Sequence, residues 1–512
     1  MDVPSLMRQA VDFYSDRPAI MTVDRAFTFE EAWQRGVQLA NWLIETGVSP
    51  GDRVASVEDN NIGAADMMIG CAIAGAARVP LYARNSREAH AHMLTRTDTK
   101  VVFADPAYGP SVSGLEDEIP SLQHVVIRGT DYDSWLASQS AKDPMVPVDP
   151  DSTCVIRHSA GTTGHPHGVG YSHRDWLVTC RNFYYRLPNL ERDSVVGHAA
   201  PVSHGSGYLF LPAWLHGCTN VLFGAFEPQS VLQQMESYRV SHMFAAPSIV
   251  AALAAVPDVG RRDWSSLRCI LVGGGPITDA TAYAGRDAFG EVLYQIFGQT
   301  EAATLTEMTP AEWFGTVEGS TPMRAAGKIL PFTRLEIRDA EGTALPIGSE
   351  GEIYAQVEGQ LRAFWNEPEL TASRLIDGWV RTGDIGRLDD NGYLYVLDRA
   401  EDLIVSGGFN IWPAELETAI ADQPEILDVA VFGVPHEKWG ETPLALCSVE
   451  PDAKVTAEDI VALVAQRLGS YKKPAVVEFT TEPLPKSPTG KLQRKVLREP
   501  YWADREARVG GA

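Results

Sequence analysis

The sequence has few cysteines, no excess of positive charge and no long apolar run, and each absence excludes a class of protein. Its six cysteines in 512 residues lie far apart without a Cys-x-x-Cys pair, which is typical of reduced thiols rather than a disulfide framework. A net charge of −24 argues against a general binder of nucleic acid or anionic membranes. The longest apolar stretches, around 67–77 and 249–256, are too short or interrupted to span a bilayer. With no signal pattern at the N-terminus, we expect a cytoplasmic protein with no integral membrane segment.

The chain is longer than one ordinary hydrophobic core needs, so we expect two or more domains. Its hydrophobic content of 45% is typical of a globular protein. One region departs from the acidic average: residues 466–498 carry eight basic and two acidic side chains. That region is either a solvated basic face or a site for an anion such as a nucleotide.

Helical and strand patterns alternate from residue 26 to about 325. The spacing of Thr28 and Glu31 predicts a capping box at the start of a helix. Buried strands are predicted at 79–81, 101–103, 242–245 and 269–272, and helices at 64–77, 230–238 and 249–256. This alternation predicts an α/β fold with a mostly parallel sheet.

The pattern changes after about residue 325. Short clusters of β-formers lie between turn signals, and the Asp-Asp-Asn-Gly sequence at 389–392 predicts a hairpin. Residues 403–500 then alternate strands and helices over the length of a small α+β domain. We therefore predict a large N-terminal domain of parallel-rich sheets with helices and a β-rich subdomain, followed by a small α+β domain.

A glycine-rich stretch at 159–168 follows an apolar run and is the first candidate site. Three glycines in eight residues let backbone N–H groups turn inward, and the threonine hydroxyls add donors that suit an anion such as a polyphosphate. The stretch lacks the Gly-Lys-Ser/Thr ending of a Walker loop, and a capping box at Ser172 and Asp175 predicts the helix start later. On its own, the stretch is also compatible with a flexible connection.

Two further candidate stretches follow predicted strands, where ligands of open α/β sheets collect. The glycines at 273–275 are compatible with a tight turn, and they also let a flat ring approach the backbone. The aromatic Phe297 suits stacking on a base, while Thr300 and Glu301 suit a phosphate and its Mg²⁺. Taken alone, Glu301 is also compatible with an ordinary surface acid.

Together, in this order and spacing, the motifs resemble the acyl-adenylate-forming superfamily, which includes acyl-CoA synthetases, stand-alone adenylation domains and luciferases. The matching stretches are those near residue 28 and at 51–54, 159–169, 297–301, 382–384, 398–417 and 490–491. The resemblance covers nearly the whole chain. It implies that a carboxylate attacks the α-phosphate of ATP to give acyl-AMP and pyrophosphate, and that a thiol, usually of coenzyme A, then displaces AMP.

The resemblance also implies an ATP site made of four groups of residues. The phosphates would lie against Ser159, Gly161, Thr162, Thr163 and Gly164. The adenine would lie between Gly274, Gly275 and Pro276 on one side and Phe297 and Gly298 on the other. Thr300 would touch the α-phosphate and Glu301 would hold Mg²⁺. Asp384 would accept both ribose hydroxyls, with Arg399 assisting.

Catalytic roles implied by the resemblance fall to Lys491, Glu301, Thr163 and His204. Lys491 would bridge the substrate carboxylate and the α-phosphate as charge redistributes. His204 would line the acyl pocket, although a lone histidine is often a satisfied core residue.

Two domains follow from the same resemblance: residues 1–398 bind AMP and the acyl group, and residues 399–512 move. The hinge would lie at about 398–402, with Glu401 at its centre. After rotation, Gly407 and Gly408 would leave room for the narrow pantetheine arm of coenzyme A.

The sequence departs from the family pattern at four positions. His167 stands where a lysine is usual, and a histidine is mostly neutral at pH 7, so we expect weaker ATP affinity or pyrophosphate handling. Phe297 replaces a common tyrosine but keeps its stacking face. Arg157 and His158 replace a common Tyr-Thr pair, for which the sequence offers no account.

We therefore predict an ATP-dependent carboxylic acid–CoA ligase that uses Mg²⁺ and acts on a hydrophobic monocarboxylic acid, fatty or aromatic. The alternatives are an adenylation enzyme that loads the pantetheine of a separate carrier protein, and a nucleotide-binding regulator without turnover. An amino acid substrate is disfavoured, because the segment after Phe244 reads Ala-Ala-Pro-Ser and lacks the expected aspartate. We expect no nucleic-acid partner, and a homodimer remains open.

Overall fold

The computed structural model describes residues 1–159, 166–399, 402–406, 409–436, 439–486 and 492–503. The predicted site residues Gly161, Thr162, Thr163, Gly164, Gly407, Gly408 and Lys491, together with Glu401, lie outside the described residues. The chain packs as two compact units, the first made of residues 1–335 and 355–381 and the second of residues 336–354 and 382–512. The predicted hinge near residue 398 is a point of rotation between two domains. A division of the chain into compact units does not test a rotation, so the hinge stays a prediction.

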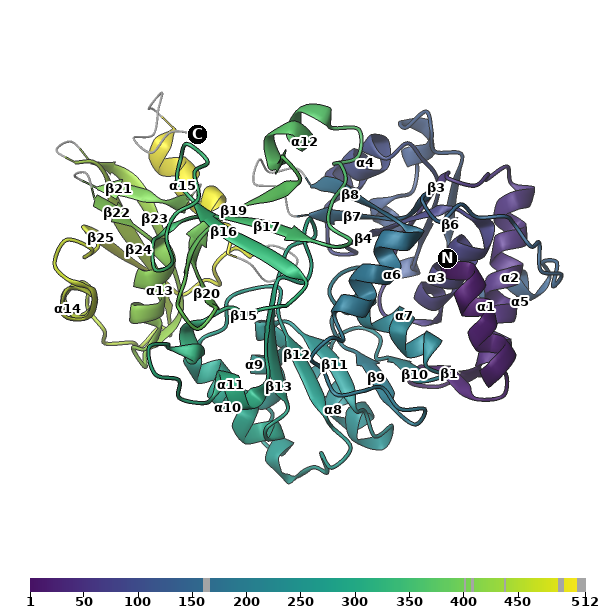
Figure 1. Cartoon of the computed structure of the whole chain (residues 1–512), viewed down its shortest axis with the longest axis horizontal. Helices are drawn as coiled ribbons and strands as arrows, with labels where there is room; N and C mark the ends of the chain where they lie inside the picture. The colour runs from purple at the N-terminus through teal and green to yellow at the C-terminus, as the bar shows by residue number, and fades with distance from the viewer. Residues whose placement is uncertain (160–165, 400–401, 407–408, 437–438, 487–491, 504–512) are drawn as a thin grey trace. The chain divides into compact units, whose positions relative to one another are not determined.

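One of the two sheets of the first unit has six strands in the order β6-β5-β3-β4-β7-β8 (Figure 1). Its strands are β3 (Arg53–Val57), β4 (Ala77–Leu81), β5 (Thr99–Ala104), β6 (His124–Ile127), β7 (Thr153–Ser159) and β8 (His167–Ser172). All neighbours are parallel except β7 and β8, which form an antiparallel hairpin. The glycine-rich stretch of the sequence therefore connects the two strands of this hairpin.

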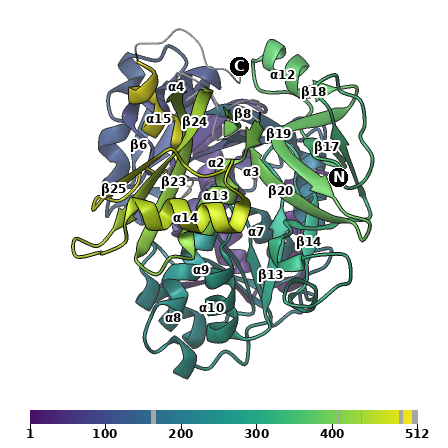
Figure 2. The ribbon, with the colours of Figure 1, turned by 90° about the vertical axis from the view of Figure 1, so that its left-hand side faces the viewer.

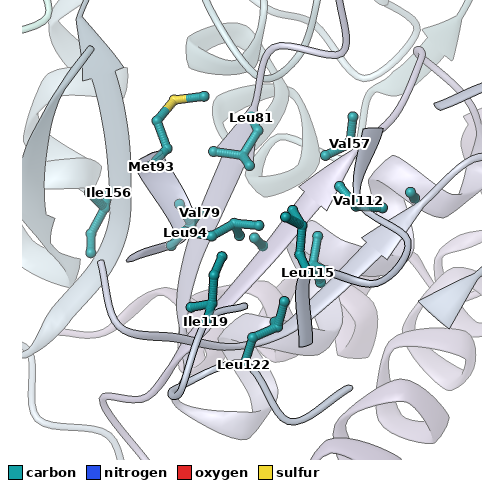
Figure 3. Close-up of a cluster of buried hydrophobic side chains, with 13 residues drawn as sticks. Val57, Val79, Leu81, Met93, Leu94, Val112, Leu115, Ile119, Leu122 and Ile156 are labelled. Carbon is teal, nitrogen blue, oxygen red and sulfur yellow. The ribbon is translucent and has the colours of Figure 1, made fainter. Parts of the chain in front are cut away.

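A buried apolar cluster packs against this sheet (Figure 3). It combines strand residues such as Val57 and Val79 with Met93 and Leu94 of α4 (Arg87–Arg96) and Leu115 of the 3-10 turn η2 (Leu115–Asp117). Figure 3 shows these side chains pointing toward one another between the strands and the helical segments. Burial of apolar side chains is the main favourable term in folding. This cluster therefore holds in place the strands whose ends carry the candidate site.

Helices α2 (Phe29–Glu45) and α3 (Ile62–Ala74) pack closely together. A side chain at Gly36 would lie 2.3 Å from Ile69 Cγ2, so a glycine permits this approach. The predicted capping box at the start of α2 is confirmed, because the Thr28 N–H donates to Glu31 (2.8 Å) and the Glu31 N–H donates to Thr28 (3.2 Å). The helix predicted at 64–77 ends earlier, because Gly75 adopts a left-handed φ of 68° and the next strand begins at residue 77.

The other sheet of the first unit runs in the order β15-β14-β13-β12-β11-β9-β10-β1-β2. Its strands are β1 (Pro18–Met21), β2 (Ala26–Thr28), β9 (Val195–His198), β10 (Thr219–Leu222), β11 (His242–Ala245), β12 (Cys269–Val272), β13 (Leu293–Phe297), β14 (Thr306–Met308) and β15 (Gly327–Ile329). The run from β13 to β1 is parallel. The strands predicted at 242–245 and 269–272 are confirmed.

The remaining helices of the first unit include the two predicted at 230–238 and 249–256, seen as α8 and α9. They are α1 (Val3–Tyr14), α5 (Tyr132–Ala137), α6 (His173–Asn182), α7 (Gly207–Leu215), α8 (Pro228–Ser237), α9 (Pro247–Ala254), α10 (Asp279–Phe289), α11 (Pro310–Trp313) and α12 (Pro368–Arg374), with the short strand β18 (Leu375–Ile376). The start of α6 is capped by Ser172, whose side chain accepts from the Asp175 N–H.

The second unit contains a sheet in the order β22-β21-β24-β23, with β25 paired to β24. Its elements are β20 (Tyr393–Arg399), β21 (Ile404–Ser406), β22 (Phe409–Ile411), α13 (Pro413–Ala421), β23 (Ile426–His436), β24 (Gly440–Val449), α14 (Ala457–Leu468), β25 (Val476–Thr480) and α15 (Arg494–Trp502). Helices α13 and α14 share one apolar cluster with this sheet, while Leu497 of α15 belongs to another. Helix α13 packs against β23, and α14 packs against α13 (Figure 2).

The division between the units falls within β16 (Thr333–Arg338), β17 (Gly351–Val357) and β19 (Trp379–Leu388). Strands β19 and β20 form the hairpin predicted at 389–392, and Gly392 takes the positive φ of 79° that the turn requires. The predicted fold class, α/β with a smaller C-terminal unit that has its own sheet, is confirmed. Among the described residues, no helix is long and apolar enough to cross a membrane.

Candidate functional site

The two ends of the glycine-rich stretch are fixed by the β7–β8 hairpin. Ser159 and His167 face each other in its register, and a side chain at Gly168 would press on Ile156 and Trp365 at 3.1–3.2 Å. His167, which stands where a lysine was expected, places its Nδ1 2.8 Å from a carboxylate oxygen of Glu367. The His167 ring is therefore held by a polar contact within the first unit.

The second predicted stretch forms a backbone corner after β12. The Gly273 N–H donates to the Ala245 carbonyl (3.2 Å), and a side chain at Gly273 would lie 2.5 Å from Ile296 Cγ2. Gly274 has a positive φ of 86°, and the predicted adenine residues Gly274, Gly275 and Pro276 are exposed. The corner thus leaves backbone accessible to a flat ligand, as the glycine pattern predicts.

The third stretch follows β13 as a tight loop. Gln299 and Ala302 exchange backbone hydrogen bonds of 3.0 and 3.1 Å, and Gly298 has no room for a side chain because Ala302 O lies 3.0 Å from its Cβ position. The Tyr171 hydroxyl donates to the Thr300 carbonyl. The ring of Phe297 is half-buried and packs against an apolar cluster that includes Leu305.

The carboxylate of Glu301 fits the expected metal. Glu301 is only 6% exposed, and its backbone is held by the Leu361 N–H, which donates to the Glu301 carbonyl at 2.7 Å. In the part of the chain that the structure describes, no ion pair or hydrogen bond engages its carboxylate, and no group of three or more acidic, histidine or cysteine residues elsewhere could hold a metal ion. A single available carboxylate suits Mg²⁺, which commonly takes one or two carboxylates together with substrate phosphates.

An apolar wall adjoins this loop. The ring of Phe244 is 6% exposed and fills the space beside Gly205, where an added Cβ would lie 2.3 Å from its ring. The same ring lies 3.6 Å from the Cβ position of Gly273. The His204 ring stands edge-on to Tyr82 with centroids 5.2 Å apart, and its Nδ1 is 2.9 Å from the Ser203 hydroxyl. The structure therefore brings Gly205, Phe244 and Gly273 together, with the predicted pocket residue His204 next to Gly205 in the chain.

Tyr171, which the sequence did not predict for the site, and Tyr208 are buried beside these segments. Their hydroxyls are 3.4 Å apart, and burial raises the pKa of both phenols. Tyr208 stacks on Phe183 at 4.2 Å, and the guanidinium of Arg157 lies 4.1 Å from the Tyr208 ring centroid. Only the strand register, which places Tyr171 opposite Val155, brings Tyr171 into this group.

The predicted ribose residues pair in the second unit. Asp384 of β19 and Arg399 of β20 face each other in register, and the Arg399 Nε lies 2.8 Å from Asp384 Oδ1. Asp384 is 4% exposed. Its N–H donates to the Thr382 hydroxyl (3.1 Å), which donates to the Ile353 carbonyl (2.8 Å). The carboxylate is thus held firmly beside one guanidinium.

A second buried ion cluster in this unit is centred on Arg494 at the start of α15. Its guanidinium lies 2.5 Å from a Glu417 oxygen, 3.1 Å from Asp402 and 3.9 Å from Asp398. Although burial opposes its charge, these carboxylates raise the pKa of Arg494. Burial raises the pKa of Asp398 to about 7, against the attraction of Arg494. The cluster therefore joins Asp398 and Asp402 to α13 and α15.

The chain matches two family models that together cover most of its length. Residues 7–365 match the AMP-binding enzyme family, and residues 415–491 match the AMP-binding enzyme C-terminal domain. The order of the two matches agrees with the order of motifs in the sequence.

Characterised relatives align over nearly the whole chain. The feruloyl-CoA synthase of an Amycolatopsis species is 33% identical over 488 residues, covering 93% of this chain and 94% of the relative. The long-chain-fatty-acid–CoA ligase FadD13 of Mycobacterium tuberculosis is 31% identical over 487 residues, covering 94% of each. The fatty acid–[acyl-carrier-protein] ligase ScoC of Streptomyces coeruleorubidus is 30% identical over 498 residues, covering 96% of this chain and 95% of the relative.

Solved structures show the same fold. The anthranilate CoA ligase AuaEII in complex with anthranoyl-AMP superposes with a TM-score of 0.88 at 24% identity, covering 98% of this chain and 97% of that one. ATP-bound MatB from Rhodopseudomonas palustris gives a TM-score of 0.86 at 26% identity, covering 98% and 99%. With the fold, the family models and the relatives in agreement, the chain belongs to the AMP-binding enzyme family as an AMP-forming acid–thiol ligase.

Proposed function

We propose that the protein is an ATP-dependent carboxylic acid–CoA ligase that acts through an acyl-AMP on a hydrophobic monocarboxylic acid, fatty or aromatic, and releases AMP and pyrophosphate. One observation carries the proposal: Gly273 lies against both Phe244 and Ile296. The apolar wall and the 297–301 loop, which begins directly after Ile296, therefore share one corner. A carboxylic acid seated on the wall would reach the loop that carries Glu301.

In the first half-reaction, an oxygen of the acid attacks the α-phosphorus of ATP as the bond to pyrophosphate breaks. Such phosphoryl chemistry needs positioning and charge stabilisation more than covalent help from the protein. We assign Thr300 to the α-phosphate and Glu301 to the metal, while Thr163 and its loop hold the outer phosphates. When bound, Mg²⁺ would neutralise phosphate charge. Lys491 would stabilise the charge that develops between the carboxylate and the α-phosphate.

We assign the rest of the nucleotide to two groups of residues, one in each unit, and each is described within its own unit. The exposed corner at 274–276 and the half-buried ring of Phe297 suit an adenine. Asp384 suits the ribose hydroxyls as a hydrogen-bond acceptor, because its backbone is anchored and Arg399 fixes its carboxylate at 2.8 Å.

In the second half-reaction, the thiolate attacks the acyl carbonyl, the bond to AMP breaks, and AMP leaves as an anion. We propose that residues 399–512 rotate about Glu401 to admit the pantetheine arm past Gly407 and Gly408. Coenzyme A is the thiol we propose. A carrier-protein pantetheine is a second candidate, because the relative ScoC is a fatty acid–acyl-carrier-protein ligase. Action in the cytoplasm and a homodimer stay predictions.

The experiment incubates the protein with ATP, Mg²⁺ and a panel of acids, with and without coenzyme A, and detects AMP and thioesters by mass spectrometry. Thioesters from one class of monocarboxylic acids are the expected result. If acyl-AMP accumulates and does not react with coenzyme A, the proposed thiol acceptor becomes the pantetheine of a carrier protein. Efficient turnover of a dicarboxylic or amino acid would contradict the proposed substrate class.

A further inference from the structure

Two buried arginines lie on neighbouring strands of the six-stranded sheet. Arg78 of β4 is 7% exposed and Arg157 of β7 is 5% exposed. Arg78 lies opposite Val155 in the parallel pairing of β4 with β7. Because Arg157 follows Val155 by two residues, both arginine side chains lie on the same face of the sheet. Among the described residues, neither guanidinium has an ion pair, and Nη1 of Arg157 has no hydrogen-bond partner.

The two guanidinium groups have different surroundings. That of Arg157 is covered by aromatic rings, because it lies 4.1 Å from the ring centroid of Tyr208 and 5.8 Å from that of Trp176. Arg78 instead lines a cavity of about 30 Å³. A cavity of this size has room for one small ion or a water molecule.

The cavity is closed on its other sides by the helices that cover this face of the sheet (Figure 1). Met7 of α1, Met68 of α3 and Leu211 of α7 contribute apolar walls, and Trp176 of α6 contributes an aromatic one. In the described part of the chain, Arg78 is the only charged residue that lines it. All of these residues belong to the first unit.

The charge of Arg78 is not balanced by the described residues around it. Burial raises the pKa of the Cys71 and Cys154 thiols, which also line the cavity, to about 12, so neither is a thiolate at neutral pH. Glu58 attracts Arg78 electrostatically, but its carboxylate is paired with Arg128. Arg157 adds a second positive charge that repels the first. A buried charge without a partner is costly, so this cavity suits an anion.

We propose that the cavity binds one monatomic halide ion, chloride under ordinary conditions, beside the guanidinium of Arg78. The guanidinium donates charge-assisted hydrogen bonds to the ion, and the apolar walls suit an anion that releases its water readily. The ion balances the two arginines where α1, α3, α6 and α7 meet the sheet, so it stabilises the first unit. The site takes no part in the proposed ligase reaction.

Thermal unfolding at constant ionic strength tests the site, with sodium chloride compared with sodium gluconate. Gluconate is too large for the cavity, and Arg78→Met removes the cation. The melting temperature in chloride minus that in gluconate is expected to be at least about 2 °C larger in the wild type than in Arg78→Met. In gluconate, Arg78→Met is expected to melt above the wild type, because it removes an unbalanced buried charge. Equal salt differences in the two proteins overturn the proposal.

An exposed arginine provides the control. Arg174 is paired with Asp151 at the surface, and its side chain is 55% exposed. Arg174→Met also removes one positive charge, but it leaves the cavity intact, so its salt difference is expected to equal that of the wild type. A salt difference lost equally in Arg174→Met and Arg78→Met would mean that chloride acts on surface charge, and would overturn the assignment to the cavity.

A direct measurement needs only the wild type, so it holds even if Arg78→Met does not fold. Crystals of the whole protein in sodium bromide are measured at the bromine absorption edge. An anomalous peak in the cavity beside Arg78 is expected. A water molecule there without anomalous signal overturns the proposal, because the guanidinium is then hydrated. Neither measurement uses ATP, an acid or a thiol, so the result does not depend on the proposed function.

Discussion

The two carboxylates that we propose as ligand-binding groups, Glu301 and Asp384, are held in place by their neighbours. Glu301 is almost buried and its backbone is fixed by Leu361, while Asp384 is fixed by Arg399 and by its N–H bond to Thr382. Buried groups with fixed orientation lose little freedom when a ligand arrives. Their removal is therefore expected to act on ligand binding more than on folding.

Asp384→Asn tests the ribose assignment. The change keeps the shape of the side chain but removes the charged acceptor, so we expect the KM for ATP to rise about 10- to 100-fold with little change in the melting temperature. Steady-state AMP release at varied ATP measures it. Asp422→Asn, which removes an exposed ion pair with Arg467, is the control and is expected to leave the KM unchanged. An unaltered KM in Asp384→Asn would remove Asp384 from the site.

Glu301→Gln tests the metal assignment. A neutral amide holds Mg²⁺ poorly, so the concentration of Mg²⁺ that gives half-maximal adenylation is expected to rise at least tenfold. Titration of Mg²⁺ at fixed ATP measures this midpoint. Glu358→Gln at an exposed pair with Arg181 serves as the matched control. The same midpoint in the wild type and in Glu301→Gln would show that another group holds the metal.

At the level of elements, the sequence predicted strands better than it predicted contacts between them. The strands at 242–245 and 269–272 are continuous apolar runs, as buried parallel strands require, and the Thr28 cap is a local motif. The end of α3 at Gly75 could not be predicted from the sequence, because apolar residues continue beyond it. The positive φ of Gly75 in the structure shows where the helix ends. The contacts of Tyr171 and Arg157 depend on the β7–β8 register and on packing against α6 and α7, which no local pattern contains.

Strand β14 contains a carboxyl group that opposes folding at high pH. Glu307 is buried, neither of its side-chain oxygens has a hydrogen-bond partner among the residues that the structure describes, and burial raises its pKa to about 8. Since the folded state holds the proton more tightly than the unfolded state, stability is greatest at low pH and falls as pH rises from about 4.5 through 8. Glu307→Gln is expected to match the wild type near pH 5 and to melt higher near pH 9. Equal melting temperatures at pH 9 would contradict the buried state of this carboxyl group.

Helix α15 is held to its unit by Arg494. Breaking a buried ion pair leaves uncompensated charges, here on Glu417 and Asp402, and costs about 3–5 kcal/mol. Arg494→Met is therefore expected to lower the midpoint of chemical unfolding of this unit. Arg467→Met, at the exposed pair with Asp422, is expected to cost less than about 1 kcal/mol. Similar losses in both variants would show that the Arg494 cluster contributes no more than a surface pair.

For the whole molecule, the order of short motifs indicated the family, because a reaction on ATP requires the same groups in the same sequence of elements. The substrate could not be predicted in the same way. The wall that we propose for it comes from the turn before α7, from β11 and from the corner after β12. The contact of Phe244 with Gly205 joins residues far apart in the chain. Arg157 was visible in the sequence as a departure, but its burial and its missing acceptor were not.

The proposed ligase reaction begins with adenylation of the acid, so adenylation that depends on an acid is its most direct test. The measurement is the exchange of labelled pyrophosphate into ATP in the presence of Mg²⁺ and the acid panel, without any thiol. We predict exchange only when a suitable monocarboxylic acid is present, and its loss in Lys491→Ala and Glu301→Gln proteins that fold normally. Exchange without an acid, no exchange with any acid, or full exchange in Lys491→Ala would contradict the account.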